Sequence, residues 1–207
     1  GQLVYHQQDS TLKLTKVEPL IIGGHPQTDP FRHTRASFDL SGGGKLLFND
    51  LRKFGWLKIL STEEVATLHQ RHGAEPLSSQ FTFQKFLTAI NHHPRRRLKP
   101  ALLDQALIAG LGNIYVDESC FAARVKPDRL IKRLTDREIK ELHRAIRRIL
   151  KLAIKKGGTS TRNYVRSDGS RGGFVPYLQV YGRVGQPCKN CRAKIIKIKL
   201  AGRGTHF

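Results

Sequence analysis

Apolar residues in the first third of the chain recur in short runs separated by turn-forming residues. Three runs lie between residues 34 and 60, and the glycines at 42–44 separate the first run from the second. The apolar members of these runs are Phe38, Leu40, Leu46, Leu47, Phe48, Trp56, Leu57 and Ile59. Runs of this length bounded by glycine predict a β-meander. Residues 21–30, rich in Gly, Pro and His, predict a loop that interrupts the strands.

Beyond residue 60 the spacing of the apolar positions becomes helical. Ser61 and Glu64 have the spacing of a capping box, so we expect a first helix to begin there. Thr135 and Glu138 repeat that spacing ahead of the strongest helical pattern in the chain, which ends at the glycines 157–158. Its apolar positions are Ile139, Leu142, Ile146, Ile149, Leu150 and Ala153.

Between these helices, the chain predicts two helices joined by a glycine turn. One is expected to begin near Pro100, to run through Leu107 and to stop at residues 110–112; the next restarts near Asn113. Exposed amides at such a helix N-terminus suit a phosphate, and Asn113 adds a side-chain donor. An ordinary helical hairpin with no ligand fits the same spacing.

The C-terminal part carries a pair of cysteines, Cys188 and Cys191, with the spacing that lets two thiolates take adjacent corners of a zinc tetrahedron. The apolar runs at 178–181 and 195–198 predict two hairpin strands that bracket this pair. Two ligands are half a zinc site, and the alternative is a turn with free thiols. Cys120 lies in an apolar helical stretch and is expected to be a small buried hydrophobic residue.

The charge of the chain indicates a polyanionic partner. Lys and Arg number 37 against 16 Asp and Glu, a formal net charge of +21, which exceeds what solubility requires. Apolar runs are too short to span a bilayer, so nucleic acid is favoured over a membrane. With three cysteines and no signal peptide, we expect a cytoplasmic, nucleoid-associated protein in a reducing setting. The absence of methionine and the strand-like opening residues indicate an incomplete chain.

Several motifs occur in the order of one known family. The sequences LDQ at 103–105, AGLGNIY at 109–115 and DES at 117–119 resemble the helix-two-turn-helix signature of formamidopyrimidine-DNA glycosylases (Fpg, MutM). Four further runs resemble the same family: DLRKFG at 50–55, SDG at 167–169 leading to Phe174, VYGR at 180–183 with PCKNC at 187–191, and AGRGTHF at 201–207. The resemblance covers essentially the whole chain.

The resemblance also implies what this sequence lacks. In the family a proline at the mature N-terminus attacks C1′ of the damaged nucleotide, assisted by a glutamate and a lysine. The opening residues resemble the point just after the family's His-x-x-Met-x-Gly stretch. We therefore expect these catalytic groups and an intercalating methionine upstream of Gly1. One structural Zn²⁺ is implied, with Cys188 and Cys191 as ligands and two more ligands expected beyond Phe207.

Several residues resemble family positions that contact DNA. Arg52 and Phe54 resemble the pair that enters the duplex, where the cation bonds the orphaned base and the ring fills the gap left by extrusion. The alternative is a β-turn with a buried phenylalanine. His33 resembles a family DNA contact, and Arg95 and Lys99 are expected to face phosphates, although a charge run is usually a solvated face.

A second set is implied to lie beside the extruded nucleotide. Gly112, Asn113 and Tyr181 resemble groups that clamp its flanking phosphates. Arg203 resembles the arginine assigned to phosphate binding and to the final elimination, which makes it the one catalytic residue predicted within this chain. The glycine-rich stretch from 167 to 174 resembles the lesion-recognition loop, whose backbone amides can read an oxidised purine, although a linker has the same composition. Its predicted contact residues are Ser167, Gly169, Gly172, Gly173 and Phe174.

These observations predict an α+β protein in three parts. Residues 1–60 are the remainder of an N-terminal β-sandwich, 61–166 a helix-two-turn-helix domain, and 167–207 the lesion loop with an incomplete zinc-finger hairpin. The implied function is a bifunctional glycosylase and AP lyase that flips 8-oxoguanine or a formamidopyrimidine, forms a Schiff base and cuts the strand by β,δ-elimination. It is expected to act as a monomer on double-stranded DNA with oxidised bases or abasic sites. The alternatives are an endonuclease VIII-like enzyme for oxidised pyrimidines and a non-catalytic damaged-DNA-binding protein.

Overall fold

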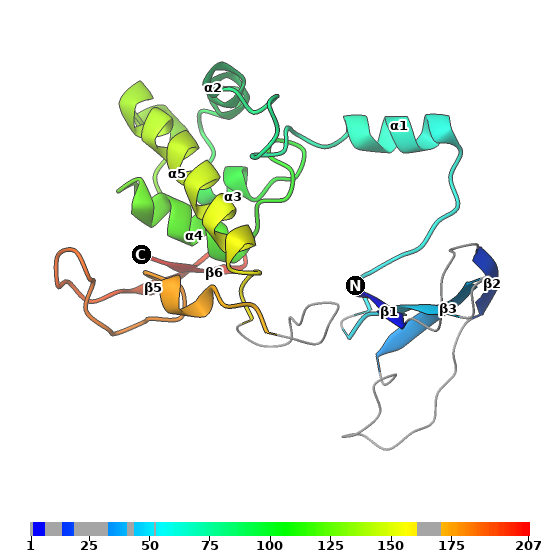
Figure 1. The fold of residues 1–207 in the computed structure, drawn as a ribbon. Helices are drawn as coiled ribbons and strands as arrows, with labels where there is room; N and C mark the ends of the chain where they lie inside the picture. Colours follow the sequence, from blue (N-terminus) through cyan, green and yellow to red (C-terminus); the bar gives the residue numbers. More distant parts are fainter. Residues whose placement is uncertain (1, 7–13, 19–32, 41–43, 52, 161–170) are drawn as a thin grey trace. The chain divides into compact units, whose positions relative to one another are not determined.

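The computed structural model describes residues 2–6, 14–18, 33–40, 44–51, 53–160 and 171–207. The chain divides into two compact units, one reaching to Ile59 and the other beginning at Leu60. The first unit contains the larger sheet, and the second contains the helices and a C-terminal hairpin (Figure 1).

The first unit is built on a four-stranded antiparallel sheet. Its strands are β1 (Gln2–His6), β2 (Leu14–Glu18), β3 (Thr34–Leu40) and β4 (Lys45–Asn49), in the order β1-β4-β3-β2. Ala36 and Leu40 of β3 and Leu47 of β4 are buried. Leu47 pairs with Ser37, the neighbour of Ala36 in β3, so buried positions occur on both faces of the sheet. The predicted meander is therefore confirmed for its first two runs.

The third predicted strand is wrong. Residues 54–60 have no regular secondary structure, and Trp56, Leu57 and Ile59 are exposed, Ile59 to 98%. β4 already pairs with β1 and β3 on its two edges, so this run has no free neighbour on β4 to pair with. An apolar run becomes a strand only where a neighbouring strand completes its hydrogen bonds.

Both capping boxes predicted in the second unit are present. Ser61 and Glu64 exchange the two capping hydrogen bonds ahead of α1 (Thr62–Gln70). Thr135 and Glu138 do the same ahead of α5 (Asp136–Lys155). A helix not predicted from the sequence, α2 (Phe83–Asn91), is capped by the Thr82 hydroxyl, which accepts from the amide of Lys85.

The helical hairpin differs from its prediction in the first helix. α3 (Leu98–Leu102) ends five residues before Leu107, and residues 103–109 form turns instead. The carboxylate of Asp104 accepts the amide of Ala106 at 3.0 Å, and this local bond competes with continuing the helix. The second helix, α4 (Asn113–Ala122), begins where it was predicted.

The core of the second unit lies between its helices. α4 and α5 pack along each other, and α2 also contacts α5. Buried side chains from each of these elements and from the intervening turns form one apolar cluster. Its largest members include Phe86, Ile90, Leu98, Leu102, Ile108, Leu111, Ile131, Ile139 and Leu142. None of the helices formed by the described residues has the length and apolar composition of a membrane-spanning segment.

The C-terminal hairpin lies later in the sequence than was predicted. β5 (Lys197–Leu200) and β6 (Arg203–His206) pair antiparallel, and β6 contacts α4. The predicted strand at 178–181 is wrong: a 3-10 turn, η2 (Val175–Tyr177), precedes it, and its amides bond to a side chain instead of a strand. Around the cysteines, one isolated bridge joins Pro187 and Lys194. A second 3-10 turn, η1 (Ile131–Arg133), precedes α5.

Candidate nucleic-acid interface

The N-terminus of α4 presents open backbone amides. Gly112 is its N-cap, is exposed, and provides no side-chain cap for the first turn. Gly110, with φ of 75°, adopts the left-handed conformation that glycine tolerates, and Gln105 fixes the turn by accepting its amide and donating to the carbonyl of Leu111. Uncapped amides and the positive end of the helix dipole favour an anion at this position.

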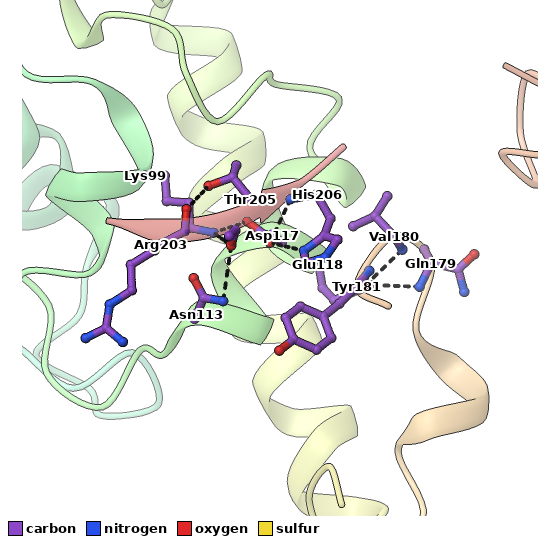
Figure 2. Close-up of polar contacts among 11 residues, drawn as sticks. Lys99, Asn113, Asp117, Glu118, Gln179, Val180, Tyr181, Arg203, Thr205 and His206 are labelled. Atoms are coloured by element: carbon purple, nitrogen blue, oxygen red, sulfur yellow. Dashed lines mark hydrogen bonds and ion pairs between the residues drawn. The ribbon is translucent and has the colours of Figure 1, made fainter. Parts of the chain in front are cut away.

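A buried carboxylate on α4 holds the C-terminal strand against this helix. Oδ1 of Asp117 accepts from Nζ of Lys99 at 2.7 Å, and its Oδ2 accepts the backbone amide of His206 at 3.0 Å and contacts Nδ1 of that imidazole at the same distance. Nζ of Lys99 also donates to the carbonyl of Gly204 at 2.8 Å. Figure 2 shows these contacts joining α3, α4 and β6 in one network.

The position of Lys99 corrects its predicted role. Its side chain is 0% exposed, so it cannot face a phosphate as expected from the sequence. Burial lowers the pKa of Lys99, and the hydrogen bond and charge of Asp117 act in the opposite direction by favouring the ammonium form. Because the ammonium has a carboxylate and a carbonyl as partners, we assign Lys99 a structural role in fixing β6.

This network places Arg203 beside the N-terminus of α4. The Asn113 amide group donates to the carbonyl of Gly204 at 3.3 Å, and Gly204 follows Arg203 directly. Arg203 is exposed, and Figure 2 shows its guanidinium on the same side of β6 as Asn113. The side-chain oxygen of Asn113 is buried without a hydrogen-bond partner within the described part of the chain. A guanidinium, a side-chain amide and open helix amides therefore lie together.

The next residue of α4, Glu118, positions a second segment. Its buried carboxylate accepts the backbone amides of Gln179, Val180 and Tyr181 at 2.9–3.0 Å. The Tyr181 ring lies against the imidazole of His206, with centroids 4.7 Å apart. Adjacent acidic residues of one helix thus hold the two segments that carry Arg203 and Tyr181.

A hollow opens next to Tyr181, and an arginine and a lysine lie on its wall. Its volume is about 520 Å³, and Arg183, Lys197 and His206 lie on its wall with Tyr181. Ser160, Val175, Leu178, Gly182 and Val184 complete the lining. A wall of this composition is suited to an anionic group such as a phosphate.

The C-terminal end of the predicted lesion loop is an anchor. The amide of Gly172 donates to Oγ of Ser160, and the amides of Gly173 and Phe174 donate to the carbonyls of Lys156 and Gly158. The Phe174 ring is 1% exposed and packs between two tyrosines, Tyr115 and Tyr177. These three amides are already bonded within the protein, so the prediction that they read a base is wrong for this structure.

Ser167, Gly169 and Arg52 lie outside the described residues. Arg95 is exposed. In the first unit, the Asp50 side chain accepts the amide of Gly55, and the Asp50 amide donates to the carbonyl of His33 at 2.7 Å.

The turn that follows Asp50 exposes an aromatic ring. Asp50 is buried, and its two hydrogen bonds fix both ends of the turn from Asp50 to Gly55. Lys53 within it has a φ of 57°, which a non-glycine residue seldom adopts. Phe54 is 76% exposed, so the alternative of a buried phenylalanine is excluded.

Comparison with known proteins decides the family. The model of the formamidopyrimidine-DNA glycosylase H2TH domain matches residues 72–165, and the model of the zinc finger found in FPG and IleRS matches residues 185–207. The formamidopyrimidine-DNA glycosylase of Halalkalibacterium halodurans is 40% identical over 99% of this chain and 76% of its own length. The chain belongs to the formamidopyrimidine-DNA glycosylase family.

Other family members show the same similarity over less of their length. The Pelotomaculum thermopropionicum enzyme is 43% identical over 87% of this chain and 66% of its own length. The crystal structure of MutM from Thermus thermophilus is 42% identical with a TM-score of 0.78, over 86% of this chain and 68% of that chain. A Lactococcus lactis Fpg in complex with DNA containing an abasic site is 36% identical with a TM-score of 0.77, and the match covers 99% of this chain and 69% of that chain. The chain spans about two thirds of the length of the first of these relatives.

The family's zinc finger is represented here by a cysteine turn. Cys188 is buried and Cys191 exposed, and the Sγ of Cys188 accepts the amide of Asn190 at 3.4 Å. Hydrogen bonds from the amides of Asn190 and Cys191 lower the pKa of Cys188, which favours the thiolate that zinc requires. The two thiols fit half of a tetrahedral set, and no cluster of three or more possible ligands occurs among the described residues. His206 is not available as a ligand because it is buried against Asp117.

Two residues that shape this interface were not assigned roles from the sequence. Asp117 and Glu118 occur in the family-like DES run, but only their burial and their long-range partners reveal what they do. One signal was present in the sequence. Two adjacent acidic residues in an otherwise apolar helical stretch are unusual, because buried carboxylates require hydrogen-bond donors.

Proposed function

We propose that this protein acts in base-excision repair as a formamidopyrimidine-DNA glycosylase with AP lyase activity. Its substrate would be a duplex that carries an oxidised purine such as 8-oxoguanine or a formamidopyrimidine, or an abasic site. Solved structures of relatives are complexes with DNA containing an abasic site, Fapy-dG or a carbocyclic 8-oxo-G. The observation that carries the proposal is that the segments bearing Arg203 and Tyr181 are both hydrogen-bonded to α4, the helix that begins with Asn113.

The roles proposed for these residues follow from their chemistry. The amides at Gly112 and Asn113 and the guanidinium of Arg203 would bind phosphates that flank the extruded nucleotide. Tyr181 would donate its hydroxyl to the same backbone. A fixed cation beside these phosphates also stabilises the negative charge that develops when the 3′ and 5′ phosphates leave during β,δ-elimination. Base removal by a Schiff base is proposed for the family's N-terminal proline, and we assign no residue of this chain to that step.

The first unit and the cysteine turn would support this reaction. Phe54, exposed on its turn, would fill the space of the extruded base, with Arg52 bonding the orphaned partner. Zinc held by Cys188 and Cys191 would supply structural cross-linking of the finger. Arg183 ties this turn to the Tyr181 segment by donating to the carbonyls of Pro187 and Gln179 at 3.0 and 2.7 Å. We further propose that the protein acts as a monomer on chromosomal DNA in the cytoplasm.

The proposal is tested by substituting Arg203 with glutamine. Binding to a duplex with a tetrahydrofuran abasic-site analogue would be followed by fluorescence anisotropy at several salt concentrations. Loss of one phosphate contact should weaken binding to every DNA sequence about equally and reduce the slope of log K against log salt by about 1. Lys132→Gln, which removes one exposed charge from η1, is the matched control. Unchanged affinity of Arg203→Gln at moderate salt would contradict the proposed interface.

Substrate class requires a separate measurement on the protein that carries the family's catalytic N-terminus. Strand cleavage would be compared on duplexes with 8-oxoguanine opposite cytosine and with an oxidised pyrimidine. Faster cleavage of the purine lesion is expected. Preference for the pyrimidine would identify an endonuclease VIII-like enzyme, and binding without cleavage of either would identify a non-catalytic protein.

A further inference from the structure

The outer face of α5 carries a continuous line of cations. All of its members are exposed, and their successive spacings of three, four, four, three and four residues keep them on one side of the helix. At 100° per residue they fall within an arc of about 80°, and they extend about 27 Å along the axis. We name this line the α5 ridge; its members are Arg137, Lys140, Arg144, Arg148, Lys151 and Lys155.

Few of these charges are neutralised. Arg144 pairs with Glu141 across an exposed surface at 2.7 Å, and Nζ of Lys140 lies 6.0 Å from the centroid of the Phe83 ring. Across the residues that the structure describes, the other four cations have no carboxylate partner within ion-pair distance. Like charges four residues apart destabilise a helix. The sequence therefore keeps an arrangement that is unfavourable for α5 in isolation.

The α5 ridge faces away from the candidate interface described above. The buried positions of α5 include Ile139, Leu142, Ile146 and Leu150, which lie on the opposite side of the helix from the ridge. α4 packs on α5, and Asn113 is the first residue of α4. A duplex seated at Asn113 and Arg203 therefore lies toward the α4 side of α5 and leaves the ridge uncovered.

We propose that the α5 ridge binds the phosphate backbone of a second segment of double-stranded DNA, without reading its sequence. This would let the protein hold two DNA segments at once. The Cβ atoms of successive ridge residues are about 5–6 Å apart, and their long side chains can reach successive phosphates. The ridge positions carry only Lys and Arg, cations that bond phosphate oxygens whatever the base sequence, so the proposed contacts are to the DNA backbone.

The composition of the ridge disfavours other occupants. A protein partner would need an apolar centre in its interface, whereas the six ridge positions are all charged. An amphipathic helix binds a membrane through its apolar face, and that face of α5 is packed in the core. Ile154, exposed beside the C-terminal end of the ridge, is a single apolar residue and forms no patch.

The test compares two triple substitutions that remove the same charge. Arg144→Gln, Arg148→Gln and Lys151→Gln are combined in the ridge variant; Arg71→Gln, Lys132→Gln and Arg133→Gln are combined in the control variant, all away from the buried core. Binding of an undamaged duplex is measured by anisotropy at several salt concentrations. The ridge variant should lower the salt slope by about 2 to 3, at roughly 0.9 per lost contact, and the control should not. Equal changes in both variants would overturn the proposal in favour of a general charge effect.

A bridging assay separates the α5 ridge from the interface at Arg203. One duplex with an abasic-site analogue is fixed to beads, and capture of a second, fluorescent undamaged duplex is measured as protein is added. The native chain and the control variant should capture the second duplex. The ridge variant should lose capture while keeping its affinity for the abasic-site duplex within about twofold, since that site is separate. Capture by the ridge variant at the native level would overturn the proposal.

Two further measurements complete the test. Binding of a poly-glutamate peptide is measured for the native chain and the ridge variant. If the ridge variant loses peptide binding but binds the duplex as the native chain does, the proposal is overturned in favour of an acidic protein partner. The ridge variant should keep its helical circular dichroism and its Tm, because glutamine is a good helix former and like-charge repulsion is relieved. If Arg203→Gln leaves DNA binding unchanged while the ridge variant lowers it, the proposed interface fails and the α5 ridge stands.

Discussion

The ammonium group of Lys99 lies 2.7 Å from Oδ1 of Asp117, and neither side chain is exposed to solvent. The same ammonium donates to the carbonyl of Gly204, and the other oxygen of Asp117 accepts from the amide of His206. This buried pair therefore does more than neutralise its own charges. It fixes the strand that carries Arg203 to the helix that begins with Asn113, so a structural interaction determines the geometry of the proposed phosphate site.

Replacing Lys99 with methionine should destabilise the second unit strongly. Met fills a similar volume but leaves the Asp117 carboxylate buried without its cation, a change that costs about 3–5 kcal/mol in comparable pairs. Urea unfolding would measure the loss. The double variant Lys99→Met/Asp117→Asn should lose less than the single variant, because no buried charge is left unpaired. A loss equal to the sum of the two single substitutions would show that the pair is not coupled.

Replacing Glu118 with glutamine should loosen the Tyr181 segment. One carboxylate accepts three backbone amides here, whereas a glutamine side chain brings one oxygen and directs an NH₂ group at amides that are themselves donors. We expect a loss of about 2–3 kcal/mol in the free energy of unfolding, measured in urea. Glu141→Gln, at an exposed surface pair, is the control and should cost less than about 1 kcal/mol. Equal effects at the two sites would exclude a special role for Glu118.

The capping box of α5 should make stability depend on acid pH. A hydrogen bond from Arg129, followed by one from the amide of Thr135, lowers the pKa of Glu138. A carboxyl group with a lower pKa in the folded state stabilises the fold above its unfolded pKa, about 4.3, and loses that contribution as pH falls through the folded value. Glu138→Gln can still cap α5 at its N3 position but loses the charge that Arg129 bonds, so it should cost up to about 1 kcal/mol at pH 7.

The difference in stability between the native protein and Glu138→Gln should shrink as pH falls below the ordinary pKa of a glutamate. Thermal unfolding at a series of pH values measures it. Lys140→Gln, an exposed change on the same helix, should leave the pH profile unaltered. A gap between native and Glu138→Gln that stays constant down to about pH 3, roughly one unit below the ordinary value, would be inconsistent with this linkage.

Two neighbouring glycines, Gly172 and Gly173, offer a matched pair where the backbone of residues 172–174 bonds to the segment 156–160. A Cβ on Gly172 would lie 2.3 Å from the carbonyl oxygen of Gly158, whereas one on Gly173 would meet nothing closer than the Lys156 carbonyl at 3.4 Å. Gly172→Ala should force the backbone apart and cost about 1–3 kcal/mol, measured by denaturant unfolding. Gly173→Ala should be nearly neutral. The reverse order would mean that the close approach between residues 158 and 172 does not persist in solution.

The sequence by itself determined the features that depend on near neighbours. The capping boxes at Ser61 and Thr135 and the start of α4 at Asn113 were predicted correctly, because each is set by hydrogen bonds within about four residues. The family-like runs and the large positive charge also indicate a nucleic-acid-binding repair protein, because residue types and their order carry that information without any tertiary contact.

Only the tertiary structure decided which polar residues are buried and what they hold. Lys99, predicted to face phosphates, is instead enclosed with Asp117, and its second partner, Gly204, lies 105 residues away in the sequence. Phe174 is an anchor in the core, and the apolar run at 56–59 forms no strand. A short apolar or charged segment has the same local pattern whether it is buried or exposed. Its environment is determined by elements far apart in the chain. Their packing decides whether a buried charge has a partner and whether an apolar run has a neighbouring strand to pair with.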